Sequence, residues 1–228
     1  MFVWILYLLA LGLIVALLLI SRSFNITAIV MSIVFGVIIY TLRGFVWVFV
    51  LFLFLTVSIY ATYSLKKKDK KKHEVRELDN VISNGLVAFM SAVFNLPVMY
   101  LGSISAALAD TLSSEIGSHS NKSPRLITNL KKQVPKGTNG GITQAGILAA
   151  IGGAGLIAIM SYFFSSGFSV VLSPTRMFFA VFIAGIAGSL IDSVLGALFE
   201  NKHQMSNGSV NFTSTLLAAI IAKIIILI

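Results

Sequence analysis

The sequence predicts an all-α fold, a polytopic membrane helix bundle with about six full spans and a proline-broken helix pair. Hydrophobic residues make up 57% of the 228 residues and charged residues only 11%, whereas charged residues are roughly 25% of a soluble domain. The apolar residues also gather in runs of about 20 residues, the length of one bilayer span. These observations exclude an ordinary water-soluble globule, and the absence of cysteine excludes disulfides and thiolate metal sites.

The first three apolar runs predict an N-terminal membrane scaffold of three helices at residues 1–64. The run at 2–20 has no basic start and no small-residue cleavage site, so we expect an anchor rather than a signal peptide. The runs at 25–42 and 44–64 are separated by a very short link, which predicts tightly turned antiparallel helices. Almost no polar group interrupts these runs, which is typical of scaffold helices.

Basic residues gather between the apolar runs and predict the orientation of the chain. Seven of the 17 basic residues lie between Lys66 and Arg76, so we expect residues 65–80 to form a cytoplasmic loop. The loop at 116–141 is also basic and is expected on the same side, within a catalytic membrane domain at 81–228. We therefore expect a multi-pass protein of the cell membrane with a cytoplasmic active site. Nothing outside the membrane is long enough to bind nucleic acid.

The apolar stretch at 81–112 is too long for one ordinary span and is broken at Asn95, Leu96 and Pro97. Proline removes a backbone donor and disfavours helix in the residue before it. The stretch is either one kinked span or a hairpin of two shorter helices. We favour the hairpin, because it alone brings both flanking basic loops to the same side. Further spans follow at 142–164, 177–199 and 212–228.

Three acidic residues, Asp110, Glu115 and Asp192, lie within or at the ends of apolar runs. A carboxylate there is costly unless it is paired, solvated or bound to a metal. On a continuous helix Glu115 is rotated about 140° from Asp110, so both can meet one ligand only if the helix frays. Asp192 lies between two glycines at a spacing of four, which lets a partner backbone or a ligand approach. Glu200 begins a polar loop and is expected to be solvated.

A segment rich in glycine and lysine leads into the apolar run at 142–164. Glycines let consecutive backbone amides turn toward an anion, and the following helix N-terminus adds positive potential. The order of residues is not the Walker pattern, so on this segment alone phosphate binding and a simple interfacial turn stay open. The candidate nucleotide-binding residues are Lys132, Gly137, Thr138, Asn139, Gly140 and Gly141.

The acids and this segment together predict a divalent cation held between carboxylates and nucleotide phosphates. Mg²⁺ suits such a site, because it takes one or two carboxylates, several waters and phosphate oxygens. We assign Asp110, Glu115 and Asp192 to Mg²⁺, with Lys132 as a further catalytic residue. Phosphoryl transfer needs mainly alignment and charge neutralisation, which these residues can supply.

The same segments carry a family resemblance. The matching stretches are ADTLSSEIG at 109–117, PRLIT at 124–128, KQVPKGTNGG at 132–141 and GSLIDSVLGA at 188–197, preceded by Arg76, Asn80, Asn84 and Gly85. Over residues 70–228 the chain resembles an integral-membrane family long catalogued as a domain of unknown function, whose plant member is the phytyl-phosphate kinase of vitamin E synthesis. That family is distantly similar to dolichol and phytol kinases and to CDP-lipid synthases, which use CTP. The chain departs from it at Leu112, where the family often has tryptophan or another large residue, and at residues 120–123, where the family has a glycine-rich approach to PRLIT.

The resemblance implies a kinase that transfers the terminal phosphate of a nucleoside triphosphate, CTP or ATP, to a polyprenyl monophosphate such as phytyl or geranylgeranyl phosphate. The product is the diphosphate, and no general base is required because the acceptor is already ionised. The partners implied are the prenyl monophosphate and membrane lipids, while the oligomeric state is not determined by the sequence. The implied substrate-binding residues are Arg76, Asn80, Asn84, Arg125 and Ser193.

Two other functions fit the same residues. A cytidylyltransferase would join CMP to a lipid and release pyrophosphate at the same kind of site. An ion-coupled transporter would also use intramembrane acids and a proline-broken helix. The transporter is the weaker alternative, because the sequence shows no inverted repeats and the acids lie near one membrane face.

Overall fold

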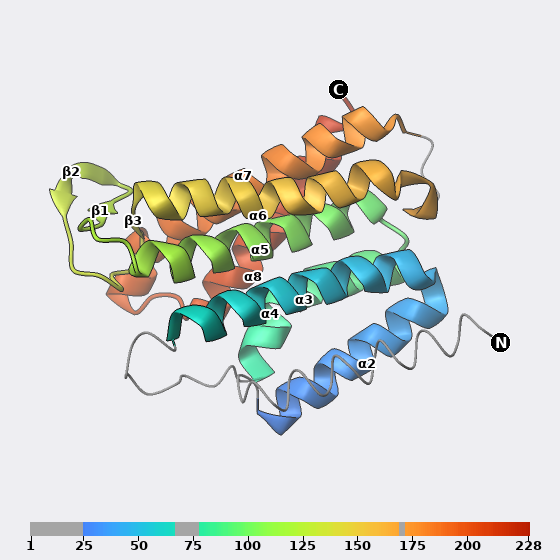
Figure 1. Cartoon of the computed structure of the whole chain (residues 1–228), viewed down its shortest axis with the longest axis horizontal. Coiled ribbons are helices and arrows are strands. Elements are labelled where there is room, and N and C mark those ends of the chain that lie inside the picture. The colour runs from blue at the N-terminus through green and yellow to red at the C-terminus, as the bar shows by residue number, and fades with distance from the viewer. Residues whose placement is uncertain (1–24, 67–77, 169–171) are drawn as a thin grey trace.

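The computed structural model describes residues 25–66, 78–168 and 172–228, which form a bundle of long helices with a small sheet at one end (Figure 1). The predicted anchor at 2–20, Arg76 and most of the basic loop lie outside the described residues. The helices are α2 (Ile26–Arg43), α3 (Phe45–Lys66), α4 (Leu78–Val93), α5 (Pro97–Ser118), α6 (Gln144–Phe163), α7 (Pro174–Leu198) and α8 (Asn207–Ile225). The shorter elements are β1 (Arg125–Leu126), β2 (Asn129–Gln133), β3 (Gly141–Ile142) and the 3-10 helices η1 (Ser165–Phe168) and η2 (Glu200–Lys202).

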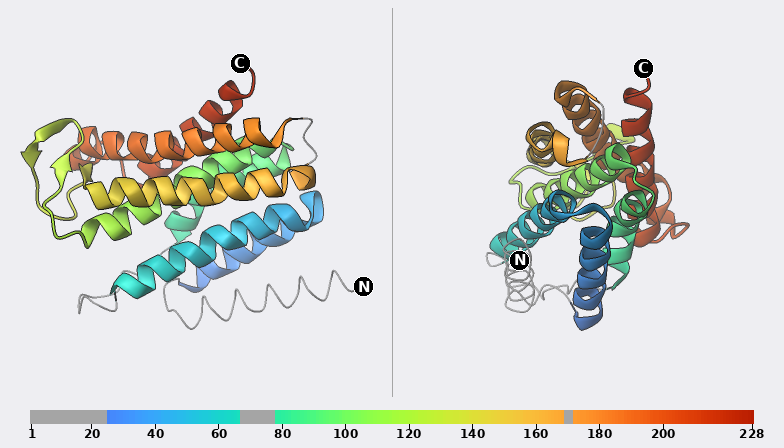
Figure 2. Two further views of the ribbon diagram at one scale, coloured as in Figure 1. Left: turned by 45° about the horizontal axis from the view of Figure 1, so that its top comes forward. Right: turned by 90° about the vertical axis from the view of Figure 1, so that its right-hand side faces the viewer.

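The predicted all-α, polytopic membrane fold is confirmed. Within the described ranges, α2, α3, α6, α7 and α8 are long and apolar enough to cross a membrane. α5 is different, because an unbroken buried run from Tyr100 to Ala109 is enclosed by α3, α4, α6, α7 and α8. α2 lies on the side of the bundle away from α6 and α7 (Figure 2). α5 is therefore the central helix around which α3, α4, α6, α7 and α8 pack.

The structure has a helix pair, α4 and α5, between which the chain reverses direction (Figure 1). Asn95 adopts the left-handed conformation, with φ 55°. Its N–H donates to the carbonyl of Ala92 at 3.2 Å, and that of Leu96 donates to the carbonyl of Ser91 at 2.8 Å. This double hydrogen bond is a Schellman C-cap. Pro97 then begins α5, where its missing N–H costs nothing, so the predicted hairpin rests on a helix stop followed by a helix start.

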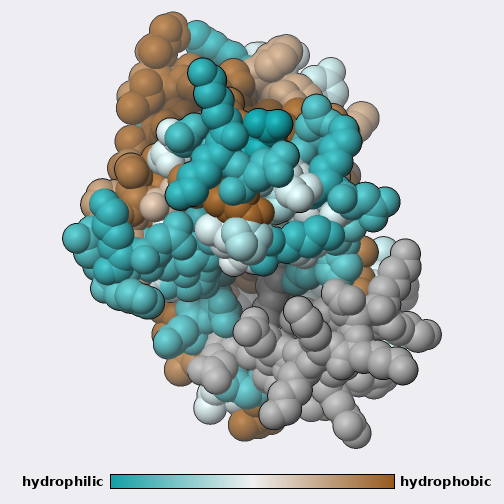
Figure 3. All heavy atoms as spheres, turned by 90° about the vertical axis from the view of Figure 1, so that its left-hand side faces the viewer, coloured by the Kyte–Doolittle hydropathy of each residue, from teal (hydrophilic) through white to brown (hydrophobic). Residues whose placement is uncertain are grey.

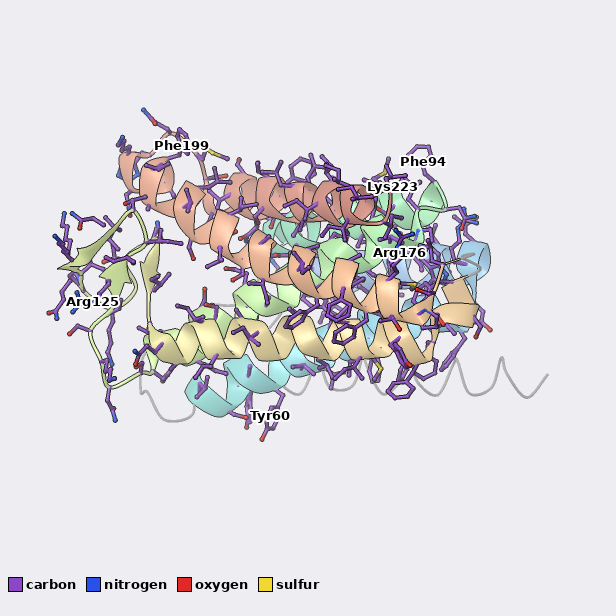
Figure 4. The ribbon with its side chains drawn as sticks, turned by 90° about the horizontal axis from the view of Figure 1, so that it is seen from above. Tyr60, Phe94, Arg125, Arg176, Phe199 and Lys223 are labelled. Carbon is purple, nitrogen blue, oxygen red and sulfur yellow. The ribbon has the colours of Figure 1, made fainter. Side chains whose placement is uncertain are left out.

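The bundle has two distinct ends, which Figure 4 shows from above. We call the end that carries the β-strands and the 199–206 segment the hairpin end, after its paired strands. The other end, where the turn between α4 and α5 lies, is the opposite end. Figure 4 labels Arg125 and Phe199 at the hairpin end, and Phe94, Arg176 and Lys223 toward the opposite end.

A single arginine ties two turns together at the opposite end. Arg43, the last residue of α2, donates from Nε to the carbonyl of Ala92 at 2.6 Å and from Nη2 to the carbonyl of Val93 at 2.8 Å. These carbonyls belong to the last turn of α4, where a cation is favourable. The turn between α2 and α3 is thereby held against the turn between α4 and α5.

The segment between α5 and α6 contains a sheet that the sequence analysis did not predict. Its strands are antiparallel in the order β2-β1-β3, and Arg125 pairs with Gln133 on one side and Ile142 on the other. Strands of two residues are too short to show the period-two alternation by which strands are recognised. β2 is exposed throughout, and its lysines disfavour pairing with another chain along this edge.

An aromatic cluster joins α3 to the centre of the bundle. The ring of Trp47 lies 4.7 Å from that of Tyr100 and 5.3 Å from that of Phe168, measured between centroids. All three side chains are almost fully buried. The Tyr100 hydroxyl donates to the carbonyl of Trp47, so the phenol is satisfied in a site where an unpaired hydroxyl would be costly.

Small residues let α5, α7 and α8 meet at very short range. A Cβ atom added at Gly188 would meet the Cβ atoms of Ala106 and Ala218, the latter at 2.9 Å. One added at Gly102 would lie 3.1 Å from the carbonyl oxygen of Ala218. Small residues at such interfaces allow the close van der Waals packing that drives helix association in lipid. We call Ala106, Gly188 and Ala218 the small-residue layer.

The small-residue layer predicts a large effect of added volume. We expect Gly188→Val to destabilise the protein by about 1–3 kcal/mol, because two packed helices must move apart to admit the side chain. Gly152→Val is the matched control, since this exposed glycine of α6 has nothing within 4 Å of an added Cβ. Thermal unfolding in detergent measures both variants, and equal melting temperatures would contradict the close packing.

Candidate active site

The packing around the small-residue layer fixes the relative direction of α5 and α7. A Cβ atom at Gly185 would meet Ser105, and one at Gly188 would meet Ala106. The two contacts advance along both helices in the same order, so α5 and α7 run in parallel toward the hairpin end (Figure 1).

The two aspartates predicted to bind metal lie one turn beyond this layer. Asp110 is four residues after Ala106 on α5, and Asp192 is four residues after Gly188 on α7. Four residues advance a helix by about one turn, or 5.4 Å, on nearly the same face. The two carboxylates, both partly buried, therefore occupy the same level of the bundle on adjoining faces of α5 and α7.

α8 supplies the third side of this level. It runs the other way, and Ser214, one turn before Ala218, donates from Oγ to Oδ2 of Asp192 at 3.0 Å. One turn further toward the hairpin end, the Asn211 amide donates to Oδ1 of Asn207 at 3.2 Å. The sequence analysis missed this polar face. Polar residues at a spacing of three to four in the first half of an apolar helix are the signal that could have revealed it.

Glu115 lies on a different face of α5 from Asp110. Its carboxylate accepts a 2.6 Å hydrogen bond from Oγ1 of Thr62 on α3, which agrees with the rotation of about 140° between the two acids. Within the described residues, no three His, Cys, Asp or Glu side chains are grouped to hold a metal ion. The assignment of Glu115 to the metal therefore stays a prediction, and the structure gives it Thr62 as its partner.

The glycine-rich segment forms a tight turn before α6. Gly137 and Gly140 have φ angles of 84° and 75°, in the left-handed region that favours glycine. Thr138 donates from Oγ1 to the carbonyl of Pro135 at 2.8 Å, and its own carbonyl accepts from the N–H of Gly141 at 2.9 Å. Thr143 then caps α6 by accepting from the N–H of Gly146 at 3.0 Å.

This turn is seated directly on α7 beside Asp192. A Cβ atom at Gly140 would meet that of Ala197 and would lie 2.5 Å from the carbonyl oxygen of Ser193. Gly140 therefore requires glycine for two independent reasons, its positive φ and the absence of space. Ser193, a predicted substrate residue, contacts the turn through its backbone. The predicted nucleotide-binding turn thus lies one residue along α7 from the predicted metal-binding aspartate.

Asn201, next to Glu200, fastens the turn to the end of α7. Asn201 donates from Nδ2 to the carbonyl of Asn139 at 2.9 Å, and the Glu200 carboxylate lies near the side chains of Asn139 and Asn207. Glu200, which the sequence predicts to be solvated, is partly buried against the end of α7. The negative charge of Glu200 acts on Asp192 by electrostatic repulsion. Two carboxylates that repel each other favour the binding of a cation between them.

The predicted substrate residues of α4 adjoin this cluster. Asn84 donates from Nδ2 to the carbonyl of Asn80 at 3.1 Å, and both side chains are partly buried. The neighbouring Ser83 lies 3.7 Å from where a Cβ of Gly208 would be, at the start of α8. α4 therefore brings its asparagines to the same end of the bundle as the polar face of α8. Arg76, predicted to act with them, lies outside the described residues.

The remaining predicted residues lie on the sheet. Lys132 is exposed on β2, the strand farthest from β3 in the sheet order. Arg125 is exposed on β1 and donates from Nη1 to the carbonyl of Leu130 at 2.7 Å. Hydrophilic residues cover much of the described part of this end of the molecule (Figure 3). Among the predicted cofactor-binding residues, the contacts with α7 and η2 come from Asn139 and Gly140, whereas Lys132 lies further out.

Comparison with known proteins identifies relatives along most of the chain. The model of the family described as integral membrane protein DUF92 matches residues 9–219. An uncharacterized membrane protein of Methanocaldococcus jannaschii is 39% identical over 90% of this chain and 87% of its own length. A second uncharacterized membrane protein, from Synechocystis, is 32% identical over 83% of this chain and 77% of its own length.

A plant relative matches a smaller part. Protein VTE6 of Arabidopsis thaliana, named as chloroplastic, is 30% identical over 59% of this chain and 39% of its own length. No solved structure matches the chain.

Removal of the hydrogen bond from Asn201 should expose the backbone of the glycine-rich turn to solvent. We expect Asn201→Ala to raise hydrogen exchange at Thr138–Gly141 by about 3- to 10-fold, the effect of losing one hydrogen bond. Asn121→Ala, at an exposed position before β1, is the control and should leave exchange unchanged. Mass spectrometry of peptic peptides makes the measurement, and unaltered protection in Asn201→Ala would contradict the anchoring role.

Proposed function

The chain belongs to the DUF92 family of integral membrane proteins, and from this premise we propose that it is a membrane-embedded polyprenyl-phosphate kinase. It transfers the terminal phosphate of a nucleoside triphosphate to a prenyl monophosphate and forms the diphosphate. The observation that carries the proposal is the juxtaposition on α7, where the glycine-rich turn seats at Ser193 and Ala197 beside Asp192. The phosphate-binding and cation-binding elements thus adjoin.

The family resemblance supplies the class of substrate. It rests on the two aspartate segments, the GTNGG element and the asparagines before the broken helix pair. It implies a prenyl monophosphate as acceptor and CTP or ATP as donor. An acceptor of this kind suits a bundle whose polar groups lie at one end of long apolar helices, because its phosphate needs cations while its tail needs an apolar environment.

Asp110 and Asp192 are the residues that would hold Mg²⁺. The fit is good, because Mg²⁺ characteristically uses one or two carboxylates and completes its octahedron with water and phosphate oxygens. When bound, the ion neutralises phosphate charge and holds the donor in line. Glu200 adds negative charge beside Asp192, which strengthens the attraction for a cation. Ser214, by donating to Asp192, fixes the orientation of the carboxylate.

The reaction needs little proton chemistry from the protein. An oxygen of the prenyl monophosphate attacks the γ-phosphorus, the bond from that phosphorus to its bridging oxygen breaks, and the nucleoside diphosphate leaves. The backbone amides of Gly137, Asn139 and Gly140 bind the donor phosphates, whereas those of Thr138 and Gly141 donate within the turn. Lys132 approaches from β2 to add positive charge. Asn80, Asn84, Arg76 and Arg125 bind the acceptor phosphate.

The hairpin end is the proposed cytoplasmic end. It carries more of the basic residues of the described segments than the opposite end does, as positive charge favours the cytoplasm. These residues are Lys122, Arg125, Lys131, Lys132, Lys136 and Lys202. This orientation gives the glycine-rich turn access to cytoplasmic nucleotides.

Removing either aspartate charge should abolish the reaction. We expect Asp110→Asn and Asp192→Asn each to lower kcat by on the order of 10²- to 10³-fold, because an essential electrostatic partner is lost. Asp79→Asn changes an exposed acid in the first turn of α4 and should keep wild-type activity. Diphosphate formation from geranylgeranyl monophosphate is the assay, with elution volume in detergent as the test of folding. Full activity in folded Asp110→Asn or Asp192→Asn would refute the assignment.

Metal removal and product analysis separate kinase from cytidylyltransferase. We expect chelation to stop the reaction and added Mg²⁺ to restore it, because the donor phosphates must be neutralised. With labelled CTP the kinase leaves CDP and prenyl diphosphate. Release of pyrophosphate with a CDP-lipid would assign the same site to cytidylyl transfer, and activity undiminished by chelation would rule out the metal.

A further inference from the structure

We propose that Tyr60 and Tyr63 of α3 lie in the headgroup region of a lipid bilayer and that the paired aspartates lie deeper, inside the same leaflet. Tyr60 is 71% exposed and Tyr63 49%, although α3 is long and apolar enough to cross a membrane. Figure 4 shows Tyr60 on the outer side of α3. Tyrosine is enriched at membrane–water interfaces, because its ring is apolar and its hydroxyl is polar. The phospholipid interface is therefore the partner that fits this surface.

Two hydrogen bonds fix the register of α3 against α5. Near the opposite end, the Tyr100 hydroxyl donates to the carbonyl of Trp47. Near the hairpin end, Thr62 donates to the carboxylate of Glu115. The partners are 53 residues apart in the chain in both pairs. The two helices therefore run in parallel with the same rise between these points, and each residue of α3 lies level with the α5 residue whose number is 53 higher.

This register places the aspartates below the tyrosines. Tyr60 lies level with residue 113 of α5 and Tyr63 with residue 116, whereas Asp110 comes earlier on the same helix. Because a helix rises about 1.5 Å per residue, Asp110 lies about 4–9 Å deeper than the two tyrosines. The aspartate of α7 shares this level, since both acids lie one turn beyond the small-residue layer.

α6 gives a second, independent measure of the same levels. A Cβ atom at Gly117 would lie 3.4 Å from the Cα atom of Gly146, and one at Gly153 would lie 3.1 Å from the Cα atom of Ala109. The two contacts follow opposite orders along the two helices, so α6 is antiparallel to α5. The level of any residue of α6 can therefore be read from these two points.

The exposed surface of α6 changes from polar to apolar at the tyrosine level. The contacts with α5 place Gly152 level with Asp110, and place Leu148, one turn closer to the hairpin end, between the two tyrosine levels. Leu148 is 69% exposed and is the first exposed apolar residue of α6. One turn further out, Gln144 is exposed, and its Oε1 accepts from Nζ of Lys122 at 2.9 Å. Both α3 and α6 therefore indicate the same membrane boundary.

Exposed aromatic side chains also mark the boundary at the opposite end. Phe45 begins α3, Tyr162 and Phe163 end α6, and all three side chains are exposed. From Phe45 to Tyr63 the helix rises about 27 Å, which is close to the hydrocarbon thickness of about 30 Å. The two aromatic levels thus enclose a length that matches the apolar part of a bilayer.

The depth of the aspartates sets the side from which each substrate of the proposed kinase arrives. A carboxylate inside the leaflet is costly unless a cation or another partner compensates it, which agrees with a metal at this level. A lipid acceptor reaches the aspartates from within the leaflet. The strands follow the end of α5, beyond the tyrosine level, so the donor nucleotide arrives from the aqueous side. The placement in the membrane holds whether or not the chain is a kinase.

Spin labelling measures these depths without any nucleotide or lipid substrate. The chain has no cysteine, so each introduced cysteine is the single labelled position. Tyr63→Cys, Leu148→Cys and Gly152→Cys carry a nitroxide in the full-length protein, in vesicles of phosphatidylcholine and phosphatidylglycerol. We expect the labels at positions 63 and 148 in the headgroup region and the label at position 152 about 6 Å deeper, because it lies about one helical turn further along α6. Gly152 has open space around it, so its label displaces no neighbour.

Relative collision rates with oxygen and with a soluble nickel chelate give the depth of each label. Asn121→Cys, exposed before β1, is the aqueous control, and Ile159→Cys, exposed on α6, is the control within the hydrocarbon. A label at position 152 that is no deeper than the one at 148 would rule out the depth of the aspartates. A label at position 63 that is shielded from both reagents would mean that protein rather than lipid covers the tyrosines, which removes the interface. Unchanged elution in detergent checks that each variant is folded.

Failure of this placement and failure of the proposed function are distinguishable. If the labels lie at the expected depths and the wild-type protein forms no diphosphate with any nucleotide, the placement stays and the kinase assignment is removed. If the wild-type protein forms the diphosphate and the label at position 152 lies in water, the kinase assignment stays and the placement is removed.

Discussion

The close approach of α5, α7 and α8 is the constraint on which the candidate site depends. Helices in lipid gain little from the hydrophobic effect and associate through close packing, which small residues permit. Ala106, Gly188 and Ala218 meet with no room for another carbon atom. Because the helices touch at this point, the side chains one turn further along, Asp110 and Asp192, must come to the same level. Gly188, by admitting this close contact, thus determines where the Asp192 carboxylate lies.

The second part of the site depends on Gly140, which has no side chain where the glycine-rich turn meets α7. Gly140 lies against α7, and Asn201 donates a hydrogen bond to the carbonyl of Asn139. The turn is therefore positioned by the helix that carries Asp192. A shared support of this kind would keep the proposed phosphate-binding amides and the proposed cation-binding carboxylate in register, as electrostatic catalysis requires. The exposed strands, in contrast, carry lysines whose long side chains can adapt to a ligand.

Sequence reasoning succeeded where the signal was local. Asn95 and Pro97 marked the end of one helix and the start of the next, and both act through their own backbone conformations. The long apolar runs gave the membrane helices, because one span buries its own backbone hydrogen bonds. Reasoning failed for the sheet, because two of its strands are too short to show a period.

The sequence by itself determined the membrane helix bundle, the broken helix pair and the acids within apolar runs. These follow from composition, from the rotation per residue of a helix and from the cost of a buried charge. Only the tertiary structure decided that Glu115 faces Thr62, that Asp192 accepts from Ser214, and that the glycine-rich turn rests on α7. The physical reason is that helix periodicity fixes the faces of one helix, whereas contacts between its face and another helix depend on how both pack.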